Sequence, residues 1–201
     1  MNELKKRRIK TVLKYTWPFY IVSAVVIVFG LNFIFKVTHQ LPAYKTLELF
    51  VSGEMVDNKK LENDILEKYK DKELKSFSCR CVNPSEGTYY RQLSVIGYSS
   101  SDIMIIPESK LELLGPANFA LDINDELQNS YFKGFATYVK DLVIYGIEVD
   151  TKKTEQYFLL PNESCYMFIN GNSKNTGKYS EDKNAEHDNA LTLVQNWGKR
   201  I

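Results

Sequence analysis

An uncharged apolar segment near the start of the chain is the feature that most restricts what this protein can fold into. It lies within TWPFYIVSAVVIVFGLNFIFKVT and has no charged side chain from Trp17 to Phe35. At about 1.5 Å of rise per residue, a helix of this length crosses the hydrocarbon layer of a bilayer. Aromatic residues gather at both of its ends, as in the interfacial belts of membrane proteins: Tyr15, Trp17, Phe19, Tyr20, Phe33 and Phe35. The segment predicts one N-terminal transmembrane helix over residues 15–37, in contact with the lipid bilayer from Trp17 to Phe35.

A basic block directly before this segment predicts its orientation. Residues 1–14 contain six basic residues and one acidic residue, Glu3. Since positive charge is retained on the cytoplasmic side, we expect a cytoplasmic tail over residues 1–14 and an extracytoplasmic C-terminal domain at the cell membrane. A cleaved signal peptide stays open as an alternative, although FKVTHQLPAYK offers only a poor cleavage site. Residues 38–45 are then a linker, and residues 46–201 form the folded domain.

The charge of the remaining chain argues against one class of partner. The whole chain has 26 basic and 25 acidic residues, so residues 15–201 hold 20 basic and 24 acidic residues. Phosphate backbones bind to basic surfaces, and here the basic block lies in the N-terminal tail. We therefore expect no nucleic acid among the partners of this protein.

Apolar patterns from residue 46 onward alternate between the strand period and the helix period. The pattern predicts strands over residues 46–53, 73–82 and 103–107, with an amphipathic helix over residues 57–71 and a shorter helix beginning near Thr88 between them. Strands and helices in this order imply crossover connections. We therefore expect an α/β fold, a single lobe with a mostly parallel sheet and flanking helices, preceded by the transmembrane helix.

The strand expected at residue 103 differs from the other two. Ile103, Met104, Ile105 and Ile106 form an unbroken apolar run that is too short for a helix on its own. A strand without polar alternation is covered on both faces, as in parallel sheets. Pro107 has no N–H to donate to a neighbouring strand, so we expect the strand to end there.

The C-terminal half predicts a mixture of short elements. We expect a short helix over residues 125–132 and strands over residues 141–150 and 154–171, the second with a possible turn at Pro161-Asn162. A polar loop follows. The chain then closes with an amphipathic helix whose core-facing residues are Leu191, Val194 and Trp197.

Three cysteines bear on redox and metal chemistry. The Cys79-Arg80-Cys81 spacing places two thiols on one face of a strand, which fits neither a zinc knuckle nor a Cys-x-x-Cys redox motif. We expect buried free thiols and no metal site or cofactor. A disulfide between Cys165 and one of the pair stays open, because such a bond is permitted outside the cell.

The order of the elements and several short sequence segments in the folded region resemble those of the bacterial extracellular solute-binding proteins of ABC importers, which have the type 2 periplasmic-binding fold. The resembling phrases are TLELFVSG, LENDILEKYKDKELKSF, SSSDIMIIPES, LVIYGIEVD, YMFINGNSKN and DNALTLVQNW, within residues 46–197. Members of that family are normally two-lobed, with the ligand held between the lobes. Here only a polar loop stands between Ile169 and Ala190, and Glu148 replaces a usual proline. The resemblance therefore implies a family member reduced to one lobe.

Candidate ligand-binding residues follow from the expected sheet. In open parallel sheets, ligands bind beyond the carboxyl ends of the strands. That rule selects Ser52, Gly53, Ser85, Glu86, Gly87, Thr88, Glu108 and Ser109. The resemblance adds Tyr145. Each also has a purely structural interpretation: the glycines as turn residues, Thr88 as a helix N-cap, and Glu108 and Ser109 as the first turn of a helix.

The sequence predicts a binding protein and not an enzyme. It has no Gly-x-Ser-x-Gly, His-Glu-x-x-His or phosphate-loop motif. One hypothesis is capture or presentation of a small solute to an ABC permease. The other is a degenerate lobe that serves as a protein-interaction module in a membrane complex. An extracytoplasmic enzyme is a third hypothesis.

Overall fold

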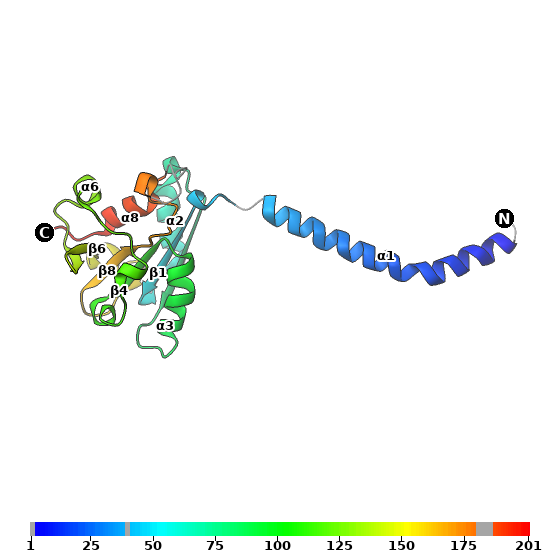
Figure 1. Ribbon diagram of the computed structural model, residues 1–201, viewed down its shortest axis with the longest axis horizontal. Coiled ribbons are helices and arrows are strands. Elements are labelled where there is room, and N and C mark those ends of the chain that lie inside the picture. The colour runs from blue at the N-terminus through cyan, green and yellow to red at the C-terminus, as the bar shows by residue number, and fades with distance from the viewer. Residues whose placement is uncertain (1–2, 39–40, 180–186) are drawn as a thin grey trace. The chain divides into compact units, whose positions relative to one another are not determined.

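The computed structural model describes residues 3–38, 41–179 and 187–201 of this protein. The chain divides into two compact units, Met1–Leu41 and Pro42–Ile201 (Figure 1). Part of the expected linker (39–40) and part of the expected polar loop (180–186) lie outside the described residues.

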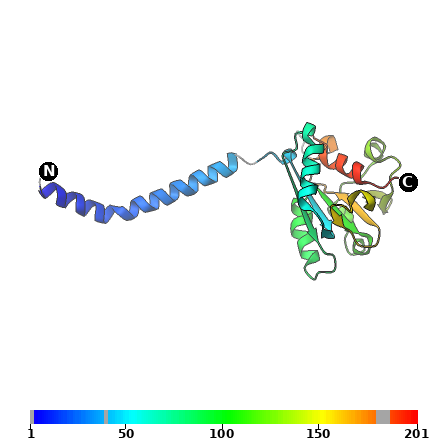
Figure 2. The same cartoon turned by 180° about the vertical axis from the view of Figure 1, so that it is seen from behind.

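The first unit is a single long helix, α1, from Glu3 to Thr38. It runs without interruption through both the predicted tail and the predicted anchor. The segment Lys14–Phe33 is long and apolar enough to cross a membrane, and none of it is buried within the structure. Pro18 lies inside the helix, where its ring removes one backbone donor, and the helix bends in its N-terminal half (Figures 1 and 2).

The second unit is built on a six-stranded sheet with the order β3-β1-β4-β8-β6-β5. Its strands are β1 (Thr46–Ser52), β3 (Ser76–Val82), β4 (Ile103–Pro107), β5 (Thr137–Lys140), β6 (Val143–Glu148) and β8 (Cys165–Ile169). β1 pairs in parallel with β3 and β4, whereas the β4–β8, β8–β6 and β6–β5 pairs are antiparallel. Four strands thus point one way and two point the other. The α/β class and the shared direction of most strands are confirmed, while the pairing itself is mixed.

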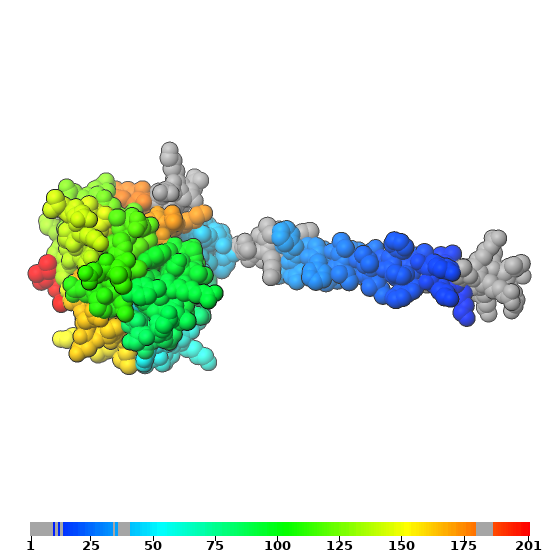
Figure 3. Space-filling view, turned by 60° about the horizontal axis from the view of Figure 1, so that its bottom comes forward, coloured from blue at the N-terminus to red at the C-terminus, as the bar shows by residue number. Residues whose placement is uncertain are grey.

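Both faces of this sheet are covered. On one face, α2 (Asn58–Lys68) and α8 (Asn189–Trp197) contribute to the larger apolar cluster. On the other face, the helical run α3 (Tyr89–Gln92), η3 (Leu93–Gly97) and α4 (Tyr98–Ser100) builds a second cluster together with α5 (Glu108–Leu111). The segments from α3 to α5, green in Figure 3, form a continuous part of the molecular surface.

The central strand β4 contributes to both clusters. Ile103 and Ile105 belong to the larger cluster, and Met104 and Ile106 to the second. All four side chains are fully buried. The prediction of a strand covered on both faces is therefore confirmed, because successive side chains of a strand point to opposite faces.

Local signals in the sequence account for the flanking helices. Asp57 accepts a hydrogen bond from the backbone N–H of Lys60 and so caps α2. The helix spacing of Leu61 and Ile65 buries one face of α2. The short elements are η1 (Ala43–Lys45), β2 (Glu54–Met55), η2 (Lys70–Lys72), η4 (Pro116–Asn118), α6 (Asp125–Leu127), η5 (Gln128–Phe132), α7 (Thr151–Thr154), β7 (Phe158–Leu159) and η6 (Gly177–Tyr179).

One strand of the C-terminal half was not predicted, whereas the turn expected within residues 154–171 is present. β5 forms a hairpin with β6 where the sequence predicted no strand, and its turn places Asp141 and Leu142 at positive φ (52° and 67°). Turns of this kind usually contain Asn and Gly, so this pair lacked the familiar signal. The segment expected as strand over residues 154–171 contains β7 and β8, separated by the turn at Pro161-Asn162.

Candidate functional site

The carboxyl ends of β1, β3 and β4 border a pocket of about 330 Å³, hereafter the edge pocket. Its walls come from the residues that follow these three strands and from the segment that joins β7 to β8. They are Gly53, Glu54, Asn83, Pro84, Ser85, Ser109, Lys110, Leu159, Leu160, Pro161 and Glu163. β1 lies between β3 and β4, and the helix that follows β1 (α2) and the helix that follows β4 (α5) lie on opposite faces of the sheet. Open α/β sheets bind ligands at this kind of switch point.

Three of the residues selected from the sequence line this pocket: Gly53, Ser85 and Ser109. Gly53 is needed because a Cβ atom there would lie 2.4 Å from the carbonyl oxygen of Leu159. The close approach of the β7 segment to the end of β1 thus forms one wall of the pocket. Ser85 is exposed, and its backbone N–H donates to the side chain of Asn83 at 2.9 Å.

The structure places two other predicted residues away from the pocket. Ser52 is fully buried, and its hydroxyl lies 2.7 Å from the hydroxyl of Tyr89, to which it is hydrogen-bonded. Burial raises the pKa of Tyr89 to about 12, and the contact with Ser52 only partly offsets this effect. Tyr145 packs against the second apolar cluster from β6. Neither side chain lines the edge pocket.

The remaining predicted residues lie on the surface near the pocket without lining it. Glu86, Gly87 and Thr88 are exposed in the loop before α3. Thr88 occupies the N-cap position of α3, yet its side chain makes no capping hydrogen bond. Glu108 is exposed, and its backbone N–H donates to the carbonyl oxygen of Ser164 at 2.9 Å.

A carboxylate that sequence reasoning did not select holds one wall in place. Glu163 accepts hydrogen bonds from both the backbone N–H and the hydroxyl of Ser109, each at 2.8 Å. These residues are 54 positions apart in the chain. No local pattern marks such a pair, because the turn at Pro161-Asn162 brings Glu163 to α5 only in the folded structure.

Lys110 brings a positive charge to the rim. Its ammonium nitrogen lies 5.8 Å from the ring centres of Tyr89 and Tyr90. A cation over aromatic faces is stabilised by the ring quadrupole, which restrains the lysine side chain. The pocket therefore combines one restrained cation, the carboxylates of Glu54 and Glu163, hydroxyl and amide groups, and the apolar side chains of Leu159 and Leu160. Such a lining suits a small ligand with both polar and apolar parts.

A larger hollow of about 600 Å³ lies beside the edge pocket, between the end of β6 and the start of β8. The two share Pro161 and Glu163. Its charged groups are largely paired with one another: Lys199 lies 2.7 Å from Glu148, and Lys153 lies 3.6 Å from Asp150.

The opposite edge of the sheet is rich in polar side chains that already have partners. Asp102 is nine-tenths buried and accepts hydrogen bonds from the Glu48 N–H (2.9 Å), the Ser173 hydroxyl (2.6 Å) and the Asn175 amide (3.1 Å). Burial raises the pKa of Asp102 despite these bonds. A hollow of about 230 Å³ here is lined by Ser99, Ser100 and Ser101, whose hydroxyls donate to carbonyl oxygens one turn earlier.

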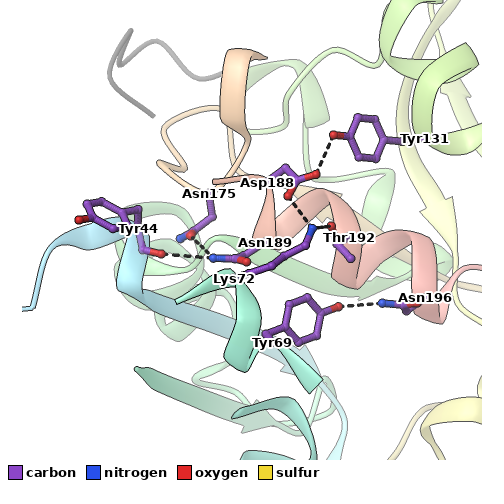
Figure 4. Close-up of polar contacts among 9 residues, drawn as sticks. All are labelled: Tyr44, Tyr69, Lys72, Tyr131, Asn175, Asp188, Asn189, Thr192 and Asn196. Atoms are coloured by element: carbon purple, nitrogen blue, oxygen red, sulfur yellow. Dashed lines mark hydrogen bonds and ion pairs between the residues drawn. The ribbon is translucent and has the colours of Figure 1, made fainter. Parts of the chain in front are cut away.

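A second polar network joins α8 to its neighbours on this side (Figure 4). Asp188 accepts from the Lys72 ammonium at 2.6 Å and from the Tyr131 hydroxyl at 2.7 Å. Burial alone would raise the pKa of Asp188, but the hydrogen bonds from Lys72 and Tyr131 outweigh it and hold the pKa below its ordinary value. Lys72 also donates to Thr192 at 2.6 Å. This network fastens the start of α8 to η2 and η5.

All three cysteines are free thiols. Cys165 is buried in β8, and Cys79 and Cys81 are half-buried in β3. Within the described part of the chain, no three His, Cys, Asp or Glu side chains gather in a way that could hold a metal ion.

Comparison with known proteins adds little. No family model matches the chain, and no curated protein matches it. One solved structure, whose title ends "with acarbose", is similar over 52% of this chain and 29% of its own length, at 15% identity and a TM-score of 0.35. The chain thus spans less than a third of that protein, and a likeness of this strength carries no argument about fold or function.

Proposed function

We propose that this protein is a membrane-anchored binding protein whose α/β unit captures or presents a small solute at the edge pocket. The observation that carries the proposal is the position of that pocket, at the carboxyl ends of β1, β3 and β4. Its volume of about 330 Å³ is typical of small-ligand sites.

Several features support this proposal. Gly53, Ser85 and Ser109 belong to the residues that the sequence selects for ligand binding, and they come together in one pocket. The helix α1 is suited to anchor the unit in the cell membrane, with its basic end in the cytoplasm. In the resembling family, such a protein delivers its solute to an ABC permease, which we propose as the partner here.

A thermal-shift screen of the full-length protein in detergent tests the proposal. Candidate solutes are amino acids, short peptides, sugars and inorganic anions. A ligand that binds only the folded state raises the melting temperature. The shift should be lost in Ser85→Ala, whose side chain lines the pocket, and kept in Ser78→Ala, an exposed serine of β3 outside it. A shift that persists in Ser85→Ala and Lys110→Ala alike would place the ligand elsewhere.

Recognition of another protein is the second candidate function. It is favoured by Leu142, whose side chain is 99% exposed at the tip of the β5–β6 hairpin, with Val139 half-exposed beside it. Together these two side chains expose apolar surface to water that a partner protein would cover. If no solute class shifts the melting temperature, protein recognition is favoured over solute binding. Leu142→Asn should then weaken association with a partner without unfolding the domain.

A further inference from the structure

Two thiols lie next to each other on the last strand of the sheet. Cys79 and Cys81 are in β3, opposite Leu49 and Val51 of β1. Both pack against the larger apolar cluster, so both point to the same face of the sheet. Both are half-buried, in contrast to Cys165 at 2% exposure. In the described part of the chain β3 is an edge strand, paired with β1 alone, and both cysteines are partly exposed.

Two neighbouring thiols could form a disulfide or bind a metal ion, and the geometry of the strand favours one of these reactions over the other. Residues two apart in a strand are about 6.6 Å apart, with their Cβ atoms pointing the same way. A disulfide requires the Cβ atoms to come within about 4.5 Å. Reaching that distance would break the pleat of β3, which is in register with β1 from Ser76 to Val82.

A bridging metal ion has a less demanding geometry. Two metal–sulfur bonds of about 2.3 Å, the length of a zinc–thiolate bond, allow the sulfur atoms to stand up to ~4.6 Å apart. Rotation of the two side chains about their χ1 angles can meet this distance without moving the strand. A two-coordinate ion therefore fits where a disulfide does not.

We propose that Cys79 and Cys81 form a binding site for a soft monovalent cation of the Cu(I) class, held between two thiolates. Thiolate ligands select Cu(I), whereas zinc normally takes four protein ligands. Binding forms two metal–sulfur bonds, breaks two S–H bonds and releases two protons to solvent. Neither the metal nor sulfur changes oxidation state, so no oxidant or reductant is needed. This site is separate from the edge pocket and does not depend on the function proposed there.

A competition titration tests the site. Reduced full-length protein in detergent, kept free of oxygen, is titrated with Cu(I) against a coloured Cu(I) chelator. We expect one tightly bound equivalent and thiolate-to-copper charge-transfer absorption in the ultraviolet. Cys79→Ser and Cys81→Ser should each weaken binding more than ~100-fold, since loss of a supporting group alone costs 10- to 100-fold. Cys165→Ser is the matched control and should bind as the wild type does.

Alkylation provides a second measurement on the unaltered protein. Iodoacetamide labelling, resolved by mass spectrometry, should find Cys79 and Cys81 protected together by Cu(I). Unchanged labelling of both residues, or a wild-type protein that never competes with the chelator, would overturn the proposal. So would tight binding in either serine variant, or an equal loss in Cys165→Ser. Circular dichroism melting of each variant establishes that it folds.

Discussion

The two edges of the central sheet carry similar polar residues and use them in opposite ways. At the amino ends of β1 and β4, Asp102 binds three donors, and the Asn170 amide donates to the carbonyl oxygens of Tyr98 and Ser101 at 2.9 Å each. At the carboxyl ends, Ser85 and Lys110 stand at the rim of an open pocket. One edge has its polar groups committed to the protein itself, and the other presents them to solvent.

This contrast shows that a cluster of polar residues does not by itself mark a ligand site. The sequence SSSD at residues 99–102 and the asparagines near residue 170 look as suitable for binding as the Ser-Gly step at residue 52. The difference lies in their partners. A buried polar group must find a hydrogen bond within the protein, which leaves none for a ligand.

The largest expected effect is at the amino edge. Asp102→Ala would remove the acceptor of three hydrogen bonds, two of them buried, and each buried donor left unsatisfied costs about 1–3 kcal/mol. We expect the free energy of unfolding to fall by about 3 kcal/mol or more, measured by urea denaturation. The matched control is Asp71→Ala, at an exposed carboxylate, which should change stability little. Equal effects of the two would remove the distinction between the edges.

The second-largest effect on stability is expected at the carboxyl edge, where the substitution disturbs packing and not hydrogen bonding. Gly53→Ala places a Cβ atom 2.4 Å from the carbonyl oxygen of Leu159, and backbone cannot move aside as a flexible side chain can. We expect a loss of about 2 kcal/mol, as for other overpacked sites. Gly87→Ala, where nothing lies within 4 Å, should be neutral in the same denaturation experiment. A neutral Gly53→Ala would mean that β7 is free to move off the end of β1.

A pH-dependent effect distinguishes the Asp188 network. Since the folded-state pKa of Asp188 is lowered, its stabilisation is present above the unfolded value near 3.8 and is lost as pH falls through the folded value. Asp188→Asn should therefore lower the free energy of unfolding by about 1–2 kcal/mol at neutral pH. The two proteins should converge only as pH falls through the folded-state pKa of Asp188, which lies below 3.8.

The control for that experiment is Glu126→Gln. Glu126 pairs with Lys178 at the surface, where solvent screens the interaction, so its replacement should leave stability unchanged at every pH. A gap between wild type and Asp188→Asn that is constant from neutral to acidic pH would show that the ionised carboxylate is not the stabilising group.

The smallest effect on stability should come from the pocket rim. Lys110→Ala removes a surface cation and its contacts with Tyr89 and Tyr90, and we expect a change of about 0.5 kcal/mol or less. Lys110→Ala should have a much larger effect on the binding of a solute found in the thermal-shift screen. Lys133→Ala, an exposed lysine away from the pocket, should alter neither quantity. A large destabilisation by Lys110→Ala would make this edge resemble the other one.

Local patterns predicted most of the elements and part of the site. The strand predicted over residues 46–53 corresponds to β1, and the helix predicted over residues 57–71 contains α2. β5 was missed because its turn uses Asp141 and Leu142 instead of the usual turn residues. Ser52 was selected for its place at a strand end, but its side chain points inward, which only the strand register determines.

The sequence by itself determined the elements whose signals lie within one turn or one strand: the apolar α1, the doubly buried β4 and the amphipathic α2 and α8. These follow from periodicity, which is a property of neighbouring residues. Only the tertiary structure decided that β8 and β6 pair antiparallel in the sheet and that Glu163 accepts a hydrogen bond from Ser109. The same holds for Asp102, whose carboxylate accepts hydrogen bonds from Ser173 and Asn175. The contacts of Glu163 with Ser109 and of Asp102 with Ser173 and Asn175 join residues more than 50 positions apart, and the cost of closing those loops is repaid by the packing of the whole domain and not by any local pattern.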